Sequence, residues 1–127
     1  MEPKIIKAST LKESLTSEGC HVSENWGSVT AGDKELSVAR ARVEPGVTAK
    51  WHYLEGVQEI YVIVKGTGKV YVGDLEPTDV VEGDVVVIPP RVSQRITNTG
   101  DSDLLFYCVC TPAFTQKCYH SEEEKHK

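Results

Sequence analysis

The sequence predicts an all-β protein, built as an antiparallel sandwich or barrel of short strands. Runs rich in Val, Ile and other β-branched residues recur between residues 35 and 111. Turn signals such as Gly73-Asp74 and Pro89-Pro90 separate these runs, and no helical periodicity occurs among them. Short strands at this regular spacing are typical of sandwiches and barrels.

The first third of the chain is expected to be less regular than the rest. Residues 1–8 suggest an extended arm. Thr10 and Glu13 stand at the spacing of a capping box, which predicts a short helix over residues 11–17 that ends at Gly19. Residues 26–30 are a weaker strand candidate. The strands expected after them are residues 35–43, 50–54, 58–65, 68–72, 78–81, 85–88, 93–98 and 104–111.

Length and charge limit the function classes that the chain can serve. A chain of 127 residues suits one domain, which we divide into an arm and helix (1–34), a barrel (35–112) and a charged tail (113–127), frayed from residue 119. The net charge of −5 argues against non-specific nucleic-acid binding. No apolar run approaches the roughly 20 residues of a membrane helix. The first residues lack the apolar segment of a secretory signal, so we expect a cytoplasmic protein.

The four cysteines are expected to be free thiols, as is usual in a reducing compartment. Cys108 and Cys110 are two apart on one expected strand, so they share a face and are poorly placed to bond each other. Two separated Cys-x-x-Cys pairs, the pattern of a zinc ribbon, do not occur. Small core or surface residues are therefore the favoured interpretation. One inward thiolate as a metal ligand is the less favoured alternative.

Two of the expected strands are apolar on both faces. Residues 60–64 read Ile-Tyr-Val-Ile-Val, and residues 85–88 read Val-Val-Val-Ile. A strand with one face in water alternates apolar and polar residues. A partner subunit would cover the second face, so the pattern favours a homodimer.

The stretch from Gly46 to Gly66 carries the first candidate chemistry. It holds two extended runs joined at Gly56, so a hairpin brings His52 and Glu59 together. Imidazole and carboxylate are both metal-ligand and acid/base groups. A similar stretch from residue 83 to residue 98 contributes Gln94. The two stretches are expected to build one pocket.

The spacing of these residues resembles the cupin superfamily. Its first motif places a Gly, a His, a Glu and a Gly at the spacing found here, and its second places a Gly, a Pro and an Asn. The resemblance spans roughly residues 35–111 and implies a double-stranded β-helix, a jelly-roll barrel with an internal pocket. The matching positions are Gly46, His52, Glu59, Gly66, Gly83, Pro89 and Asn98.

Three departures from the family pattern concern the site. Leu54 replaces the second His of the first motif, Gln94 replaces the His of the second, and Arg91 replaces a turn Gly. The resemblance implies a ligand set of three His and one Glu, which here is reduced to His52 and Glu59 with Gln94 as a third candidate. We expect Leu54 to line the pocket and make one side dry.

Such a donor set predicts a divalent metal, with manganese or iron(II) favoured over nickel or zinc because oxygen donors predominate. His52, Glu59 and Gln94 would occupy one face of the ion and leave positions for water and substrate. Each residue also has an ordinary structural explanation. His52 would bond a backbone carbonyl, Glu59 would pair with a cation, and Gln94 would be a satisfied buried amide.

A metal-free reaction is the competing prediction, with His52 and Glu59 as an acid/base pair like that of the sugar-nucleotide epimerases that share this fold. Arg40 is a candidate for holding an anionic substrate, because a guanidinium binds a carboxylate with two hydrogen bonds. A solvated strand face is the alternative role of Arg40. Tyr61 shares the face of Glu59, as a pocket hydroxyl or as core.

The function predicted from these residues is that of a mononuclear metal-binding cupin. Its small-molecule ligand would be anionic or carbonyl-bearing, and the resemblance implies dioxygenase, decarboxylase, isomerase or lyase chemistry. His52 and Glu59 would be catalytic. The alternatives are a non-catalytic module that binds or senses a small molecule, and a metal-free sugar epimerase or isomerase. Metal content separates the first of these from the other two.

Overall fold

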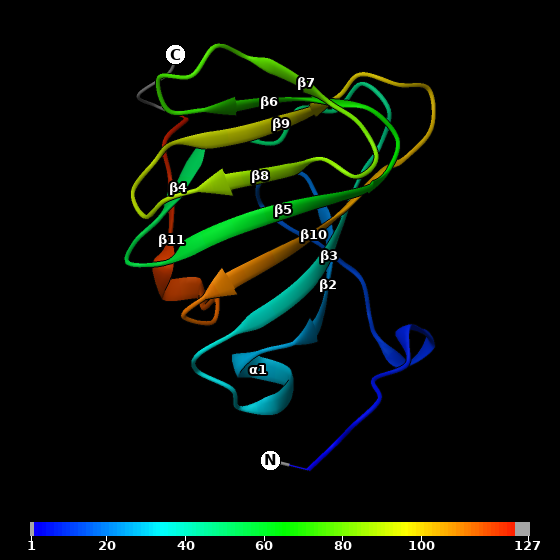
Figure 1. The fold of residues 1–127 in the computed structure, drawn as a ribbon, viewed down its shortest axis with the longest axis vertical. Coiled ribbons are helices and arrows are strands. Elements are labelled where there is room, and N and C mark those ends of the chain that lie inside the picture. The colour runs from blue at the N-terminus through cyan, green and yellow to red at the C-terminus, as the bar shows by residue number, and fades with distance from the viewer. Residues whose placement is uncertain (1, 124–127) are drawn as a thin grey trace.

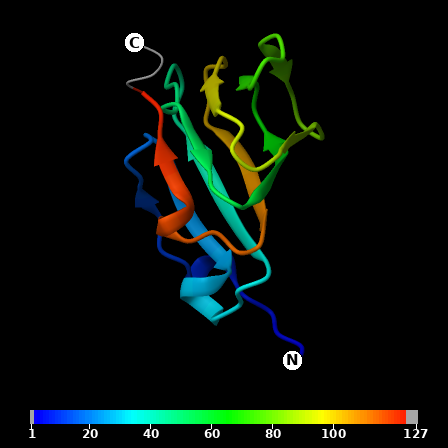
Figure 2. The ribbon, with the colours of Figure 1, turned by 90° about the vertical axis from the view of Figure 1, so that its left-hand side faces the viewer.

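The computed structural model describes residues 2–123, which form two facing antiparallel sheets (Figures 1 and 2). Six strands form the first sheet, in the order β1-β2-β3-β10-β5-β8, and five form the second, in the order β11-β4-β9-β6-β7. The first sheet contains β1 (Ser14–Leu15), β2 (His21–Trp26), β3 (Ser37–Val43), β10 (Leu104–Thr111), β5 (Gln58–Lys65) and β8 (Val85–Ile88). The second contains β11 (Tyr119–Ser121), β4 (His52–Leu54), β9 (Gln94–Asn98), β6 (Gly68–Val72) and β7 (Thr78–Val80).

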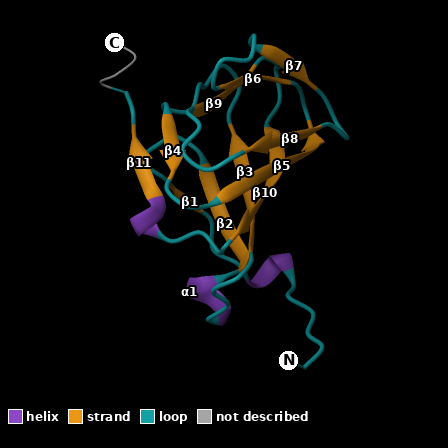
Figure 3. Cartoon of the chain, turned by 60° about the vertical axis from the view of Figure 1, so that its left-hand side comes forward, coloured by secondary structure: helices purple, strands orange, loops and turns teal. Residues whose placement is uncertain are grey.

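This arrangement confirms the predicted all-β jelly-roll class. Strands adjacent in a sheet come from distant parts of the chain: β10 lies between β3 and β5, and β9 lies between β4 and β6. Within residues 2–123, helical structure is limited to three short turns, η1 (Ala8–Thr10), α1 (Ser28–Ala31) and η2 (Gln116–Cys118) (Figure 3). None of the helices in the described residues is long and apolar enough to cross a membrane.

Alternation along the strands decides which side chains enter the space between the sheets. In β3, Ala41 and Val43 are buried, whereas Arg40 and Arg42, which alternate with them, are only half-buried. The core includes side chains from both sheets, among them Ile63, Ile96 and Phe106. A second apolar cluster joins Leu54, Val57, Cys110 and Cys118 beneath the C-terminal segment.

The helix predicted over residues 11–17 is wrong, because Ser14–Leu15 form a strand paired with β2. Glu13 does not cap a helix. Its carboxylate instead pairs with Arg42 at 2.7 Å, and this contact across the sheet replaces the local capping pattern. The strand candidate at residues 26–30 is also misplaced. The strand β2 ends at Trp26, and α1 follows it.

The C-terminal tail is more ordered than the sequence suggested. Tyr119–Ser121, expected to fray, form β11 and pair with β4, so that Tyr119 lies opposite Leu54. Residues 124–127 of the expected tail lie outside the described residues. Figure 2 shows the first strands, in blue, and β11, in red, on the same side of the molecule. Both ends of the described chain therefore complete the barrel.

The turn that lacks the family's Gly is made by Arg91 in a left-handed conformation, with φ of 67°. Arg91 has the only positive φ among the described residues other than Gly. Its backbone N–H donates to the Leu54 carbonyl at 2.9 Å, and its side chain bonds Glu55 at 2.7 Å. These contacts hold a backbone conformation that costs an L-residue about 1–2 kcal/mol.

Candidate functional site

His52 opens the short strand β4 and points into the barrel, where it is 4% exposed. Its Nδ1 lies 2.9 Å from the backbone carbonyl oxygen of Lys50. A carbonyl only accepts hydrogen bonds, so Nδ1 carries the ring hydrogen and donates a hydrogen bond to the Lys50 carbonyl oxygen. The other ring nitrogen, Nε2, is therefore the one available for chemistry in the pocket.

Two residues that the sequence analysis missed flank this imidazole. Glu18 places Oε2 3.4 Å from His52 Nε2, and the Tyr119 ring stacks on the imidazole at 5.0 Å between centroids. Glu18 lies between β1 and β2, and Tyr119 begins β11. Neither belongs to a motif, and residue spacing alone gave no signal for either. Their positions follow from how the terminal segments pack against the barrel.

Glu59 comes from β5 and is 7% exposed. Burial raises the pKa of its carboxyl, and this effect outweighs the opposing influence of His52 and Gln94. The Cys110 thiol contacts Glu59 Oε2 at 3.7 Å. Among the described residues, Glu59 Oε1 is buried and has no hydrogen-bond partner. Glu59 is thus a carboxyl with a raised pKa and with one oxygen that lacks a hydrogen-bond partner among the described residues.

Gln94 and Tyr61 form a hydrogen-bonded pair deep in the barrel. Gln94 lies opposite His52 in the pairing of β4 with β9 and is 1% exposed. The Tyr61 hydroxyl donates to Gln94 Oε1, and the Tyr61 ring packs on Phe106 at 4.6 Å. Burial, followed by the charge of Glu59, raises the pKa of Tyr61. The Tyr61 hydroxyl therefore stays protonated and occupies the amide oxygen of Gln94.

These groups surround a cavity of about 40 Å³. A cavity of that volume holds a few water molecules or a ligand of few atoms, since one water molecule needs roughly 10–15 Å³. Leu54 and Tyr61 are both among the residues that line this cavity, and the Leu54 side chain is apolar. The lining residues are Glu18, Cys20, Val22, Ala41, Ala49, His52, Leu54, Glu59, Tyr61, Ile96, Phe106, Cys108, Phe114 and Tyr119.

The three predicted metal donors do not fit an ion as they stand. Gln94 is not among the residues that line the cavity, and its amide oxygen is already bonded to Tyr61. Across residues 2–123, no group of three or more His, Cys, Asp and Glu side chains is arranged to hold a metal. His52 and Glu59 alone supply two donors, too few for a protein site of this kind. The metal predicted from the sequence stays a prediction that this geometry does not favour.

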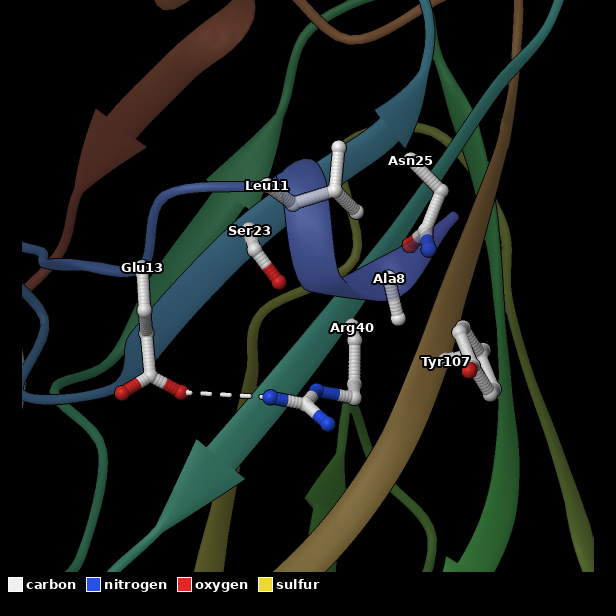
Figure 4. Close-up of a pocket in the computed structure, with 7 residues that line it drawn as sticks. All are labelled: Ala8, Leu11, Glu13, Ser23, Asn25, Arg40 and Tyr107. Atoms are coloured by element: carbon white, nitrogen blue, oxygen red, sulfur yellow. Dashed lines mark ion pairs between the residues drawn. The ribbon is translucent and has the colours of Figure 1, made fainter. Parts of the chain in front are cut away.

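Arg40 is not part of the internal pocket, which corrects its predicted place there. It lies on the outer face of β3, because alternation turns Ala41 rather than Arg40 inward. There it lines a separate surface pocket of about 70 Å³, with its Nη2 3.7 Å from Glu13 Oε2 (Figure 4). Tyr107 and Leu11 border the same pocket. An anion bound by Arg40 would therefore lie outside the barrel, away from His52.

The four cysteines are free, as expected. Cys20 and Cys108 line the cavity, and Cys110 lies beside Glu59. Burial is the main cause that raises the pKa of all four thiols, including Cys118. Thiols in this state are poor nucleophiles and poor metal ligands, because both roles need the thiolate.

Comparison with known proteins places the fold. The family model described as "Cupin domain" matches residues 39–110. An uncharacterized protein of Methanocaldococcus jannaschii is 31% identical over 116 residues, which cover 90% of this chain and 92% of that protein.

Two further proteins resemble this chain. An oxalate-binding protein of Thermotoga maritima is 37% identical over 77 residues, covering 61% of this chain and 63% of that one. The solved structure of a nucleoside dehydratase from Streptomyces has a TM-score of 0.77 at 16% identity, covering 95% of this chain and 92% of that one. At that identity the likeness concerns the fold alone. The matched cupin segment leaves out the positions of Glu18 and Tyr119.

Proposed function

Because this chain belongs to the cupin family, we propose that it transfers protons on a small carbonyl-bearing molecule held inside the barrel, without a resident metal. The contact between His52 Nδ1 and the Lys50 carbonyl carries this proposal. It fixes the tautomer and orientation of the ring, as the backbone or carboxylate partner of a catalytic histidine does. A histidine held in this way is suited to general acid–base catalysis.

The proposed step needs one base and one acid. His52 Nε2 removes a proton from a carbon next to the carbonyl, and the electrons of the broken C–H bond form an enolate. Glu59 then supplies a proton from its carboxyl group to the substrate. Its raised pKa suits it to this role. Isomerases, epimerases and lyases share this step. The dehydratase with a similar fold is consistent with lyase chemistry in such a barrel.

Deuterium exchange tests the proposal. The protein is treated with a chelator, its metal content is checked by mass spectrometry, and dihydroxyacetone is added in deuterated water. We expect exchange of the C–H protons, and we expect His52→Ala to slow it by roughly 10²-fold or more. Tyr53→Ala, on the outer face of the same strand, is the matched control. Equal exchange rates in wild type and His52→Ala would refute the proposal.

The metal-dependent alternative gives a different outcome in the same experiment. Manganese or iron(II) bound near one per chain, absent from His52→Ala, would restore the function first predicted from the sequence. Exchange that returns only after metal addition would have the same meaning. Persistence of exchange in metal-free protein supports the acid/base site.

A non-catalytic binding module is the second candidate function. The small cavity and the replacement of two expected imidazoles by Leu54 and Gln94 favour it. A module would bind a small molecule in the barrel and give no exchange above the His52→Ala level. The oxalate-binding relative is consistent with this candidate.

We also propose that the protein forms a homodimer through the outer face of β5 and β8. Val85 and Val87 are each 55% exposed on β8, a strand at the edge of its sheet, and Val64 of β5 is 40% exposed. Contiguous apolar side chains of this kind are typical of interfaces. Light scattering should give twice the chain mass for wild type and the single mass for Val85→Lys/Val87→Lys. Leu75→Lys, at an exposed turn residue, controls for added charge.

A further inference from the structure

The charges around the cavity identify what kind of molecule it accepts, if a small molecule enters the barrel as proposed above. Glu18 and Glu59 both line the cavity. Among the described lining residues none is Lys or Arg, and His52 is the sole group able to carry a positive charge. His52 Nε2 already faces the carboxylate of Glu18 at 3.4 Å. No cationic group is therefore left over for an anionic ligand.

The backbone at Glu18 is anchored to the barrel. Its backbone carbonyl accepts a hydrogen bond from the Lys50 N–H at 2.9 Å, which ties the segment to the residue that also orients His52. A tight turn around Glu18 is closed by the Thr16 N–H, which donates to the Cys20 carbonyl at 2.8 Å. Gly19 next to it takes a φ of 99°, which an L-residue rarely adopts. The backbone that carries this carboxylate is thus fixed beside the cavity, and the carboxylate itself lies against His52.

The neighbouring acidic groups respond to this negative environment. Burial raises the pKa of Tyr61 and of Cys108, and the negative charge of Glu18 adds to this effect. An anionic ligand would meet the same penalty, because a buried charge without a partner costs several kcal/mol. The unpaired Glu59 Oε1 adds a second requirement. It is satisfied by a ligand that donates a hydrogen bond.

We infer that the cavity selects small molecules that donate hydrogen bonds and carry no negative charge, and that Glu18 sets this preference. Carboxylates and phosphates are excluded from the metal-free protein by the same carboxylate. This separates the chain from its oxalate-binding relative, although the two are 37% identical over the 77 residues that align. It also replaces the anionic ligand expected from the sequence with an uncharged or cationic one.

Three molecules of one shape test the inference: oxamide, oxamate and oxalate, which carry no charge, one negative charge and two. Their affinities for chelator-treated protein are measured by NMR titration at neutral pH. We expect oxamide to bind at least about tenfold more tightly than oxalate, a difference of about 1.4 kcal/mol. In Glu18→Gln, oxalate should bind about tenfold more tightly than it does to wild type. Glu76→Gln, on the exposed surface, should leave the order unchanged.

Three results would overturn the inference. They are tighter binding of oxalate than of oxamide in metal-free wild type, an unchanged ratio in Glu18→Gln, and no binding of oxamide up to its solubility limit. Circular dichroism confirms that Glu18→Gln is folded. The two experiments can fail independently. Deuterium exchange tests the proposed role of His52, and the affinity series tests the proposed role of Glu18. A charge preference without exchange keeps this inference and makes the protein a binding module.

Discussion

The barrel segment and the two terminal segments contribute differently to the site. The barrel segment, residues 39–110, places His52 on β4 of one sheet and Glu59 and Tyr61 on β5 of the other, where the register within each sheet fixes the side chains. The terminal segments add Glu18 and Tyr119, which contact His52 directly. The barrel thus supplies the reactive groups, and the terminal segments supply the charge and the walls around them. The family model includes the reactive groups of the barrel but not Glu18 and Tyr119.

The largest effect on stability is expected when two phenylalanines that line the same cavity are compared. Phe106 is 2% exposed in the barrel core, and Phe114 is half-buried in the C-terminal segment. Phe106→Ala should lower the free energy of unfolding by about 3–5 kcal/mol, as large core truncations do. Phe114→Ala should lower it by about 1–2 kcal/mol, because less apolar area is lost from the interior. Urea denaturation measures both. Equal losses would mean that the two segments form one undivided core.

A second test uses the pH dependence of stability that Glu59 contributes. Burial raises its pKa above the ordinary 4.5, so the native protein keeps a proton that the unfolded chain has released. This contribution is complete below pH 4.5 and is lost as the pH rises through the native pKa. Glu59→Gln has no carboxyl that can ionise in the native protein, so it keeps the stability that wild type loses as the pH rises. Above neutral pH the variant should be more stable than wild type by about 1 kcal/mol or more.

Urea denaturation at several pH values measures that effect, with Glu76→Gln as control for the removal of one exposed charge. The difference between wild type and Glu59→Gln should grow as the pH rises from 4.5 through the native pKa of Glu59 and then level off. A difference that stays constant with pH would show that Glu59 is ionised in the native barrel at acid pH. His52 would then be the sole candidate acid in the barrel segment.

A smaller effect is expected from the buried pair inside the barrel. Tyr61→Phe removes the hydroxyl that donates to Gln94 Oε1, which leaves a buried amide unsatisfied. The free energy of unfolding should fall by about 1–2 kcal/mol. Tyr71→Phe, on the outer face of β6, is the matched control and should change it by less than about 0.5 kcal/mol. Loss of the same size in both variants would mean that the Tyr61–Gln94 bond adds no stability.

The smallest effect concerns the turn at Arg91. Arg91→Gly relieves the left-handed conformation but loses the exposed pair with Glu55. We expect a change within about 1 kcal/mol. Arg91→Ala loses the pair and keeps the strain, so it should be about 1 kcal/mol less stable than Arg91→Gly. Thermal unfolding of the two variants measures this difference directly, and no difference between them would show that the turn is unstrained.

Much of the barrel follows from the sequence, because alternation and turn residues are local signals. The bounds of β5, β6, β8 and β10 are those expected from the sequence. The inward direction of Glu59 and Tyr61 follows from the same parity. Parity also predicts that Arg40 faces outward, since Ala39, Ala41 and Val43 alternate with the arginines. The solvated strand face, the alternative role of Arg40, agrees with this parity.

The terminal parts of the site could not be predicted in this way. Glu13 pairs with Arg42 across 29 positions of sequence, and this contact decides against the helix that local capping suggested. Glu18 and Tyr119 reach His52 through tertiary packing, and their neighbours in sequence carry no repeating pattern. Gln94 was expected to bind a metal. Its bond with Tyr61 joins β9 of one sheet to β5 of the other, and residue spacing does not report how the two sheets face each other.

Glu18 and Tyr119 lie on either side of one imidazole but are far apart along the chain, and this has a consequence for biosynthesis. Glu18 is synthesised early and Tyr119 late. The Tyr119 ring can therefore stack on His52 only after every strand other than β11 has been synthesised. A nascent barrel therefore has an open pocket, with apolar walls within reach of chaperones and proteases. Closure of that pocket is a late step of maturation, and a pulse-labelled chain should become protease-resistant only when β11 has been released.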